Sequence, residues 1–182
     1  MTATKYKFTT QEYHLMSEVG MFAPEHRLEL IKGEIVEMSP IGRKHCACIA
    51  KLQKKFEQIL GENIIVWTQN SIHLDGESEP QPDLALLKLR ADFYEERLPR
   101  SKDILLIVEV ADSTISYDRD VKMPLYAELG IIEAWLVDVN AKTLTKYTEP
   151  SCTGYKTSHR LELNDEVLCL DVVINLTDIF GS

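Results

Sequence analysis

Residues 103–110 constrain the fold more than any other part of the sequence. The segment reads DILLIVEV and is nearly all apolar and β-branched. Such a run is typical of a central strand that is buried on both faces of a sheet. Its one interior carboxylate is Glu109, and an unpaired charge in such an apolar strand is costly. Glu109 is therefore the first candidate for a functional residue.

The residues that follow this strand predict a β-α-β unit. Ser113 or Thr114 is placed to cap a helix over residues 118–129, which Gly130 ends. A second apolar strand is predicted over residues 131–137. A strand, a helix and a further strand in succession indicate the α/β fold class.

Further elements are expected on both sides of this unit. Upstream we expect a helix from Thr9 or Thr10 to near Gly20, and then a β-hairpin over residues 27–38 that turns at Lys32-Gly33. Apolar residues at helical spacing predict a long amphipathic helix over residues 40–60. Other extended segments are predicted over residues 64–67, 71–74, 82–87, 144–147, 155–157 and 166–170, before a short final helix capped by Asn175 or Thr177.

Length and composition predict one folded domain over residues 1–182. The content of 45% hydrophobic and 27% charged residues is that of an ordinary globular protein. Neither an export signal nor a run of about 18 apolar residues is apparent, so the cytoplasm is the expected compartment and no membrane association is expected. The four cysteines are accordingly expected to be reduced thiols.

The formal net charge of −9 disfavours broad, sequence-independent binding of nucleic acid, because phosphate affinity comes mostly from Lys and Arg. Two local clusters could still form a basic surface. They are Arg43, Lys44, Lys51, Lys54 and Lys55, and Lys88, Arg90, Arg97, Arg100 and Lys102. Proteins that hold a divalent cation also carry extra carboxylates for that purpose, so a negative net charge argues less strongly against nucleic-acid binding in such a protein.

Two acids at the ends of predicted strands suggest a metal site. Asp83 lies at the start of one strand and Glu109 at the end of another, so neighbouring strands would bring the two carboxylates together. Two close carboxylates repel unless a proton or a cation separates them. Mg²⁺ meets that need, since it binds oxygen ligands and retains water. Lys122 lies four residues after Asp118, so both are expected on one helix face, within reach of the acids.

Each of these residues also has an ordinary structural explanation. Asp83 and Asp118 fit the roles of turn or cap residues, and Lys122 fits that of a solvated helix residue. His45, near a helix start, is equally compatible with contact to a phosphate, contact to a scaffold acid, or a surface position. Glu109 is the hardest of the set to explain structurally, for the reason given above.

Several short motifs occur in a fixed order along nearly the whole chain. They are LELIKGE (residues 28–34), His45, QPDLA (residues 81–85), VEV (residues 108–110), Ser113-Thr114, Asp118, Lys122, Tyr126, Gly130 and EAWLVD (residues 133–138). In order and spacing they resemble the restriction-endonuclease-like Uma-type endonuclease family of bacteria. That family belongs to the PD-(D/E)XK nuclease superfamily.

The resemblance implies a mixed central sheet flanked by helices, to which the N-terminal hairpin and the C-terminal strands are added. It implies Asp83 and Glu109 as ligands of Mg²⁺ or Mn²⁺, and a homodimer. The superfamily lysine is expected two residues after Glu109, where this chain has Ala111. In the resembled family the lysine stands on the next helix, at the position of Lys122. Glu29 matches a family glutamate that could approach the same cation, although a hairpin glutamate facing water is the alternative.

These observations lead to one main hypothesis and two alternatives. In the main hypothesis the protein hydrolyses DNA phosphodiesters: Asp83 and Glu109 bind Mg²⁺, Lys122 assists the attacking water, and Glu29 and Asp118 support the site. The first alternative is a catalytically degenerate or regulatory module that binds nucleic acid. The second is an acidic protein-interaction domain on the same fold. Cleavage of DNA would support the main hypothesis, and binding of DNA without cleavage the first alternative. Neither binding nor cleavage would leave the second alternative.

Overall fold

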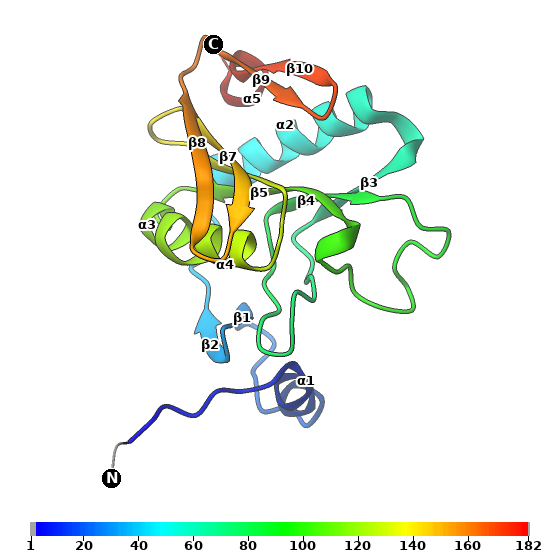
Figure 1. The fold of residues 1–182 in the computed structure, drawn as a ribbon, viewed down its shortest axis with the longest axis vertical. Coiled ribbons are helices and arrows are strands. Elements are labelled where there is room, and N and C mark those ends of the chain that lie inside the picture. The colour runs from blue at the N-terminus through cyan, green and yellow to red at the C-terminus, as the bar shows by residue number, and fades with distance from the viewer. Residues whose placement is uncertain (1–2, 182) are drawn as a thin grey trace.

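A six-stranded mixed sheet forms the centre of the computed structural model, which describes residues 3–181 (Figure 1). In spatial order its strands are β3 (Ile64–Thr68), β4 (Leu84–Lys88), β5 (Ile104–Ala111), β6 (Glu133–Asp138), β7 (Thr143–Ser151) and β8 (Gly154–Leu161). β5 pairs with β6 in parallel, and the other neighbours pair antiparallel. The predicted mixed sheet with β5 in its interior is thus confirmed.

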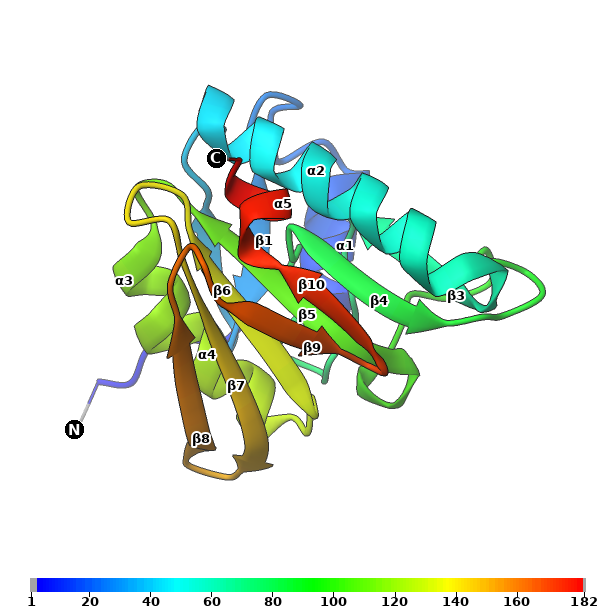
Figure 2. The same ribbon diagram turned by 90° about the horizontal axis from the view of Figure 1, so that it is seen from above.

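Helices cover both faces of this sheet. On one face lie α2 (Arg43–Leu60), α5 (Leu176–Phe180) and a hairpin of β9 (Glu166–Cys169) and β10 (Val172–Asn175) (Figure 2). On the other face lie α3 (Ile115–Tyr117) and α4 (Met123–Glu128). The two faces carry separate apolar clusters, both buried against these helices.

Alternation along β5 decides which way Glu109 points. Leu106, Val108 and Val110 belong to the apolar cluster under α2. Ile107 and Ala111 belong to the cluster under α4. Because successive side chains of a strand point to opposite faces, Glu109 faces α4 together with Ile107 and Ala111.

The N-terminal part forms α1 (Thr10–Glu18) and a separate hairpin of β1 (Leu28–Ile31) and β2 (Glu34–Glu37), as the sequence predicts. The Thr9 side chain accepts a hydrogen bond from the Glu12 backbone and forms a capping box with it. The hairpin turns at Lys32 and Gly33, whose φ values are +49° and +77°. Two positive φ values fit a tight two-residue turn, which explains the glycine.

Two predicted segments differ in the structure. The long helix begins at Arg43 rather than at residue 40, because Gly42 has extended backbone and precedes the first turn. Residues 71–74 form no strand. Their backbone N–H groups instead donate to loop carbonyls, with Ile72 bonded to Pro80 and His73 to Pro99. The polar loop therefore satisfies this backbone without a neighbouring strand.

The helix predicted over residues 118–129 also differs. It begins earlier, at Ile115, and it contains a π-helical turn over Asp118–Lys122 before α4. In that turn the Met123 N–H donates to the Asp118 carbonyl, five residues back. Pro124 has no N–H to give the usual bond four residues back, and this favours the wider turn.

Two further expectations concern the chain as a whole. All four cysteines are free thiols, two of them buried and two exposed, as predicted. Within residues 3–181, no helix has both the length and the hydropathy that crossing a membrane requires.

Candidate functional site

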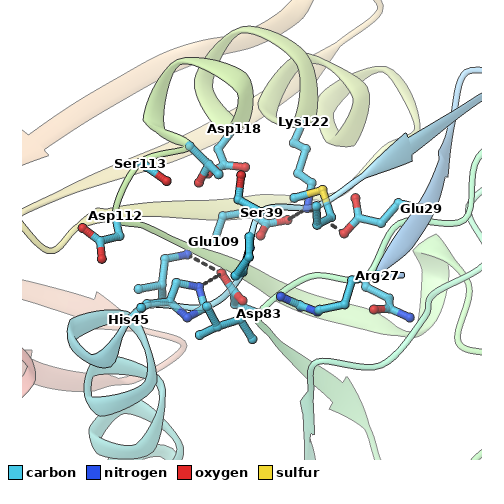
Figure 3. Close-up of a pocket in the computed structure, with 17 residues that line it drawn as sticks. Arg27, Glu29, Ser39, His45, Asp83, Glu109, Asp112, Ser113, Asp118 and Lys122 are labelled. Atoms are coloured by element: carbon cyan, nitrogen blue, oxygen red, sulfur yellow. Dashed lines mark hydrogen bonds and ion pairs between the residues drawn. The ribbon is translucent and has the colours of Figure 1, made fainter. Parts of the chain in front are cut away.

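A pocket with a volume of about 190 Å³ opens beside the C-terminal end of β5 (Figure 3). Its walls come from four stretches that are far apart in the chain. These contribute Arg27 and Glu29 from the hairpin, Gly42 and His45 from the start of α2, Gln81 and Asp83 from before β4, and Glu109, Asp112, Asp118 and Lys122 from β5 and the turn that follows it. The structure thus gathers all six candidate residues at one pocket.

Strand register explains why Asp83 and Glu109 meet. β4 and β5 pair antiparallel, and Leu84 opposite Val108 is the last pair at this end, so Asp83 and Glu109 both come one residue beyond it. The two carboxylates therefore lie at the same end of the two strands. The Val110 N–H donates to Asp83 Oδ2 at 2.9 Å and fixes the orientation of this carboxylate.

Lys122 lies between two carboxylates in the interior. Its Nζ is 3.0 Å from Glu29 Oε1 and 3.2 Å from Glu109 Oε1, and the residue is 1% exposed. Burial by itself lowers the pKa of Lys122, but Glu109, Glu29 and Asp118 outweigh it and hold the pKa above its ordinary value. Lys122 is therefore a fixed ammonium group, not the solvated helix residue of the alternative.

Two acids of the pocket are harder to ionise than usual. Burial raises the pKa of Glu109 well above its ordinary value; Lys122 opposes this shift, while Asp83, Asp118 and Glu29 add to it. The Tyr126 hydroxyl donates a hydrogen bond to Glu109 Oε1. Burial also raises the pKa of Asp118, which accepts a hydrogen bond of 2.6 Å from Thr114. Adding one more negative charge at this place is unfavourable, and adding a cation is favourable.

The structure shows where the two remaining candidates lie. Glu29 is 1% exposed, so the alternative of a hairpin glutamate facing water is wrong, and its Oε2 is buried without a hydrogen-bond partner. His45 is buried rather than on the surface. Its Nε2 lies 2.9 Å from Asp83 Oδ2, which makes it a contact of a scaffold acid. Its Nδ1 is also buried without a partner.

The donor set of the pocket fits a hard divalent cation. Four buried carboxylates, those of Glu29, Asp83, Glu109 and Asp118, line the pocket together with one buried ammonium. Over residues 3–181, no three His, Cys, Asp or Glu side chains form a ready-made metal cluster. Mg²⁺ is typically held by only one or two carboxylates and keeps several waters, so two of these carboxylates, such as Asp83 and Glu109, would suffice as protein ligands.

Comparison with known proteins identifies the family. The family Uma2, described as "Putative restriction endonuclease", matches residues 10–177. The chain belongs to this family. The match spans every residue of the pocket, from Arg27 to Lys122.

A solved structure shares the fold of this Uma2 protein. It is the crystal structure of a "putative nuclease belonging to DUF820" from Anabaena variabilis ATCC 29413. The two chains superpose with a TM-score of 0.73 at 15% sequence identity, over 96% of this chain and 98% of the other. No curated protein matches this chain.

Sequence reasoning gave no role to two residues, one that lines this Uma2 pocket and one that contacts its Glu109 from outside the lining. Tyr126 appeared in a motif without a role, and its hydroxyl contacts Glu109. Arg27 was not considered as a site residue, and it lines the pocket. One signal was available: Arg27 stands two residues before Glu29, and residues so spaced in an extended segment share a face.

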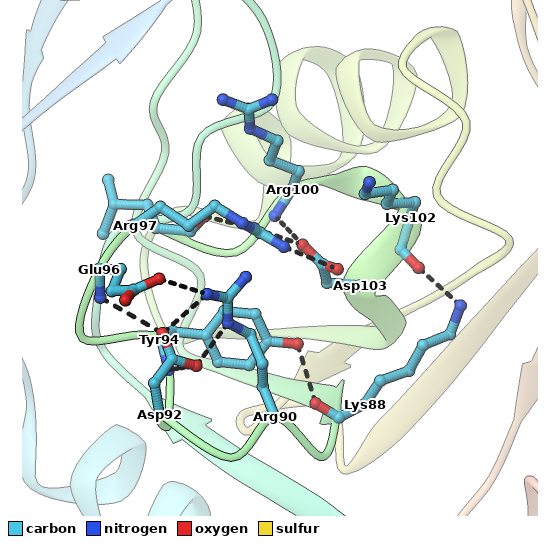
Figure 4. Close-up of polar contacts among 10 residues, drawn as sticks. Lys88, Arg90, Asp92, Tyr94, Glu96, Arg97, Arg100, Lys102 and Asp103 are labelled. Atoms are coloured by element: carbon cyan, nitrogen blue, oxygen red, sulfur yellow. Dashed lines mark hydrogen bonds and ion pairs between the residues drawn. The ribbon is translucent and has the colours of Figure 1, made fainter.

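Two of the five residues of the second basic cluster, Arg90 and Arg97, are paired with acids (Figure 4). Arg90 pairs with Asp92 and with Glu96, the latter at 3.2 Å, and Arg97 pairs with Asp103 at 2.7 Å. Both guanidinium groups also lie over the ring of Tyr94. Arg90 and Arg97 therefore stabilise the loop between β4 and β5, and their guanidinium groups are already paired with carboxylates.

Proposed function

We propose that this Uma2-family protein hydrolyses phosphodiester bonds in DNA with the help of Mg²⁺ or Mn²⁺. The observation that carries the proposal is the gathering of four buried carboxylates and one ammonium at a single pocket. A buried excess of negative charge is unfavourable unless a cation or protons offset it. The family description, "Putative restriction endonuclease", agrees with this chemistry.

Asp83 and Glu109 would hold the ion. Such an ion supplies a more acidic bound water and offsets negative charge on a phosphoryl oxygen. The protein orients the two ligands in advance, because the Val110 N–H fixes Asp83 and the Tyr126 hydroxyl contacts Glu109. Preorganised ligands lose less entropy when the ion binds.

Lys122 acts as a cation in this proposal. Its raised pKa keeps the amine protonated, so it stabilises charge that develops on the phosphate and positions the attacking water. Glu29 holds the ammonium in place through its contact of 3.0 Å. Asp118 adds to the field that keeps Lys122 charged.

The test is cleavage of plasmid and single-stranded DNA during titration with Mg²⁺ or Mn²⁺. We expect cleavage by the unmodified protein and a loss of roughly a hundredfold or more for Asp83→Asn and Lys122→Met. Lys156→Met is the matched control, since Lys156 is an exposed lysine of β8 outside the pocket and outside both basic clusters.

Thermal unfolding gives a second readout that does not need activity. Mg²⁺ at about one hundred times its dissociation constant adds about 2.7 kcal/mol of stability, and Asp83→Asn should lose this gain. DNA binding without cleavage would favour the degenerate module instead. Neither binding nor cleavage at low salt would leave the protein-interaction domain.

A further inference from the structure

Arg27 lies at the pocket with its position set by the backbone. It precedes β1, and the Met38 N–H donates to its carbonyl at 2.8 Å, which extends the hairpin pairing by one step. Arg27 and Glu29 are two residues apart in extended chain, so both side chains point toward the pocket. In Figure 3 the guanidinium reaches across the pocket toward Asp83, while Glu29 lies deeper, against Lys122.

The guanidinium of Arg27 differs from the other arginines in what surrounds it. Four arginines, Arg90, Arg97, Arg119 and Arg160, each form an ion pair with a nearby carboxylate. Within residues 3–181, no carboxylate oxygen lies within 4.0 Å of the Arg27 guanidinium. Arg43 and Arg100 share this property, but both are exposed, whereas Arg27 is half-buried.

An anion that enters this pocket needs such a group. A phosphodiester carries one negative charge and would approach four carboxylates. The Lys122 ammonium is already shared between Glu29 and Glu109. Arg27 is thus a cation of the described pocket lining that no carboxylate occupies, and its planar guanidinium matches two oxygens of a phosphate.

We propose that Arg27 binds the phosphate group of the DNA strand that enters the pocket for cleavage. This inference rests on the proposed function and extends it, because it names a substrate-binding residue. Arg27 contacts the non-bridging oxygens, so its contribution does not depend on the base sequence.

The first test measures binding of a short DNA duplex by fluorescence anisotropy over a range of KCl concentrations, with Ca²⁺ in place of Mg²⁺ to limit turnover. We expect Arg27→Ala to weaken binding about tenfold and to reduce the slope of log affinity against log salt by about one. Arg27→Lys should keep the slope and lose part of the affinity, because it keeps the charge and loses the fork. Arg100→Ala removes the same charge outside the pocket and should change neither.

The second test uses bis(4-nitrophenyl) phosphate, a small phosphodiester, with Mn²⁺. If Arg27 holds the reacting phosphate, Arg27→Ala raises KM for this substrate as well as for DNA. An unchanged KM for the small diester, with weaker DNA binding, would place Arg27 on a neighbouring phosphate and overturn the proposal. The thermal shift caused by Mg²⁺ should be preserved in Arg27→Ala, which separates phosphate binding from metal binding.

The outcomes also separate this inference from the proposed function. Cleavage by the unmodified protein, with DNA affinity, salt slope and KM all unchanged in Arg27→Ala, overturns the inference and leaves the function standing. Absence of cleavage overturns the proposed function, and the DNA-binding assay then still tests the role of Arg27. A loss of DNA affinity in Arg27→Ala that Arg100→Ala does not show supports the phosphate contact. Equal DNA binding by the unmodified protein and Arg27→Ala, or no binding by either, overturns the inference about Arg27.

Discussion

Replacing Lys122 by Met should destabilise the protein strongly, because it leaves buried charge without a partner. Lys122 is 1% exposed and contacts Glu29 and Glu109, which are 1% and 2% exposed. Breaking a buried ion pair by removing one partner costs about 3–5 kcal/mol. In a chain of this length each kcal/mol lowers Tm by about 2–4 °C, so we expect Tm to fall by roughly 6–20 °C.

The penalty should shrink as the pH falls. Burial holds the pKa of Glu109 above its ordinary value of 4.5, and Lys122 is the group that opposes this shift. Without Lys122 the folded state binds a proton at Glu109 more tightly still, while the unfolded state titrates near the ordinary value. Stability of Lys122→Met therefore rises as the pH falls through the folded pKa of Glu109 and levels off near pH 4.5.

The assay is urea denaturation at about pH 8 and about pH 5, with a chelator present. The double variant Lys122→Met/Glu29→Gln serves as the matched control, since neutralising Glu29 should recover part of the loss. A loss below about 1 kcal/mol, which is typical of an exposed pair, or a loss that is independent of pH, would refute the reasoning.

Two other predictions concern the Asp118 carboxyl and the position of the lysine. Burial raises the pKa of Asp118 above its ordinary value of 3.8, so the stability of the unmodified protein falls as the pH rises from 3.8 through the folded pKa. Asp118→Asn should remove this loss. Urea titrations at neutral pH should therefore find the variant more stable than the unmodified protein. Moving the lysine to the superfamily position, in Ala111→Lys/Lys122→Met, should restore neither Tm nor cleavage. Ala111 is 0% exposed within an apolar cluster, where a lysine side chain has no room. Recovery of either quantity in the double variant would contradict this account of the packing.

The sequence was sufficient to predict the mixed sheet and the strand that carries Glu109. The apolar run of residues 103–110 predicted β5, and burial on both faces confirmed it. Strand periodicity also predicts that Asp83 and Glu109 reach the same place, provided that β4 and β5 are neighbours. That β4 and β5 are neighbours is a long-range property that the local sequence pattern does not show. Only the family resemblance indicated it.

Other features could not be predicted because tertiary contacts decide them. Residues 71–74 have the composition of a strand, but their N–H groups find loop carbonyls, and no neighbouring strand is needed. Arg90 and Arg97 belong to a cluster that is basic in sequence, but in space Asp92 and Asp103 offset their charges. The π-helical turn changes the spacing that placed Asp118 and Lys122 on one face of an ordinary α-helix.

The N-terminal hairpin belongs to the site rather than to the periphery of the fold. A two-stranded hairpin is marginally stable alone, so β1 and β2 need other contacts to hold Glu29 in place. The Tyr13 hydroxyl of α1 donates to the Leu28 carbonyl at 2.9 Å, and the Glu79 N–H donates to the Leu30 carbonyl at 2.7 Å. These bonds flank Glu29 on both sides. Because a buried Glu29 is tolerable only beside Lys122, docking of the hairpin and completion of the pocket depend on each other.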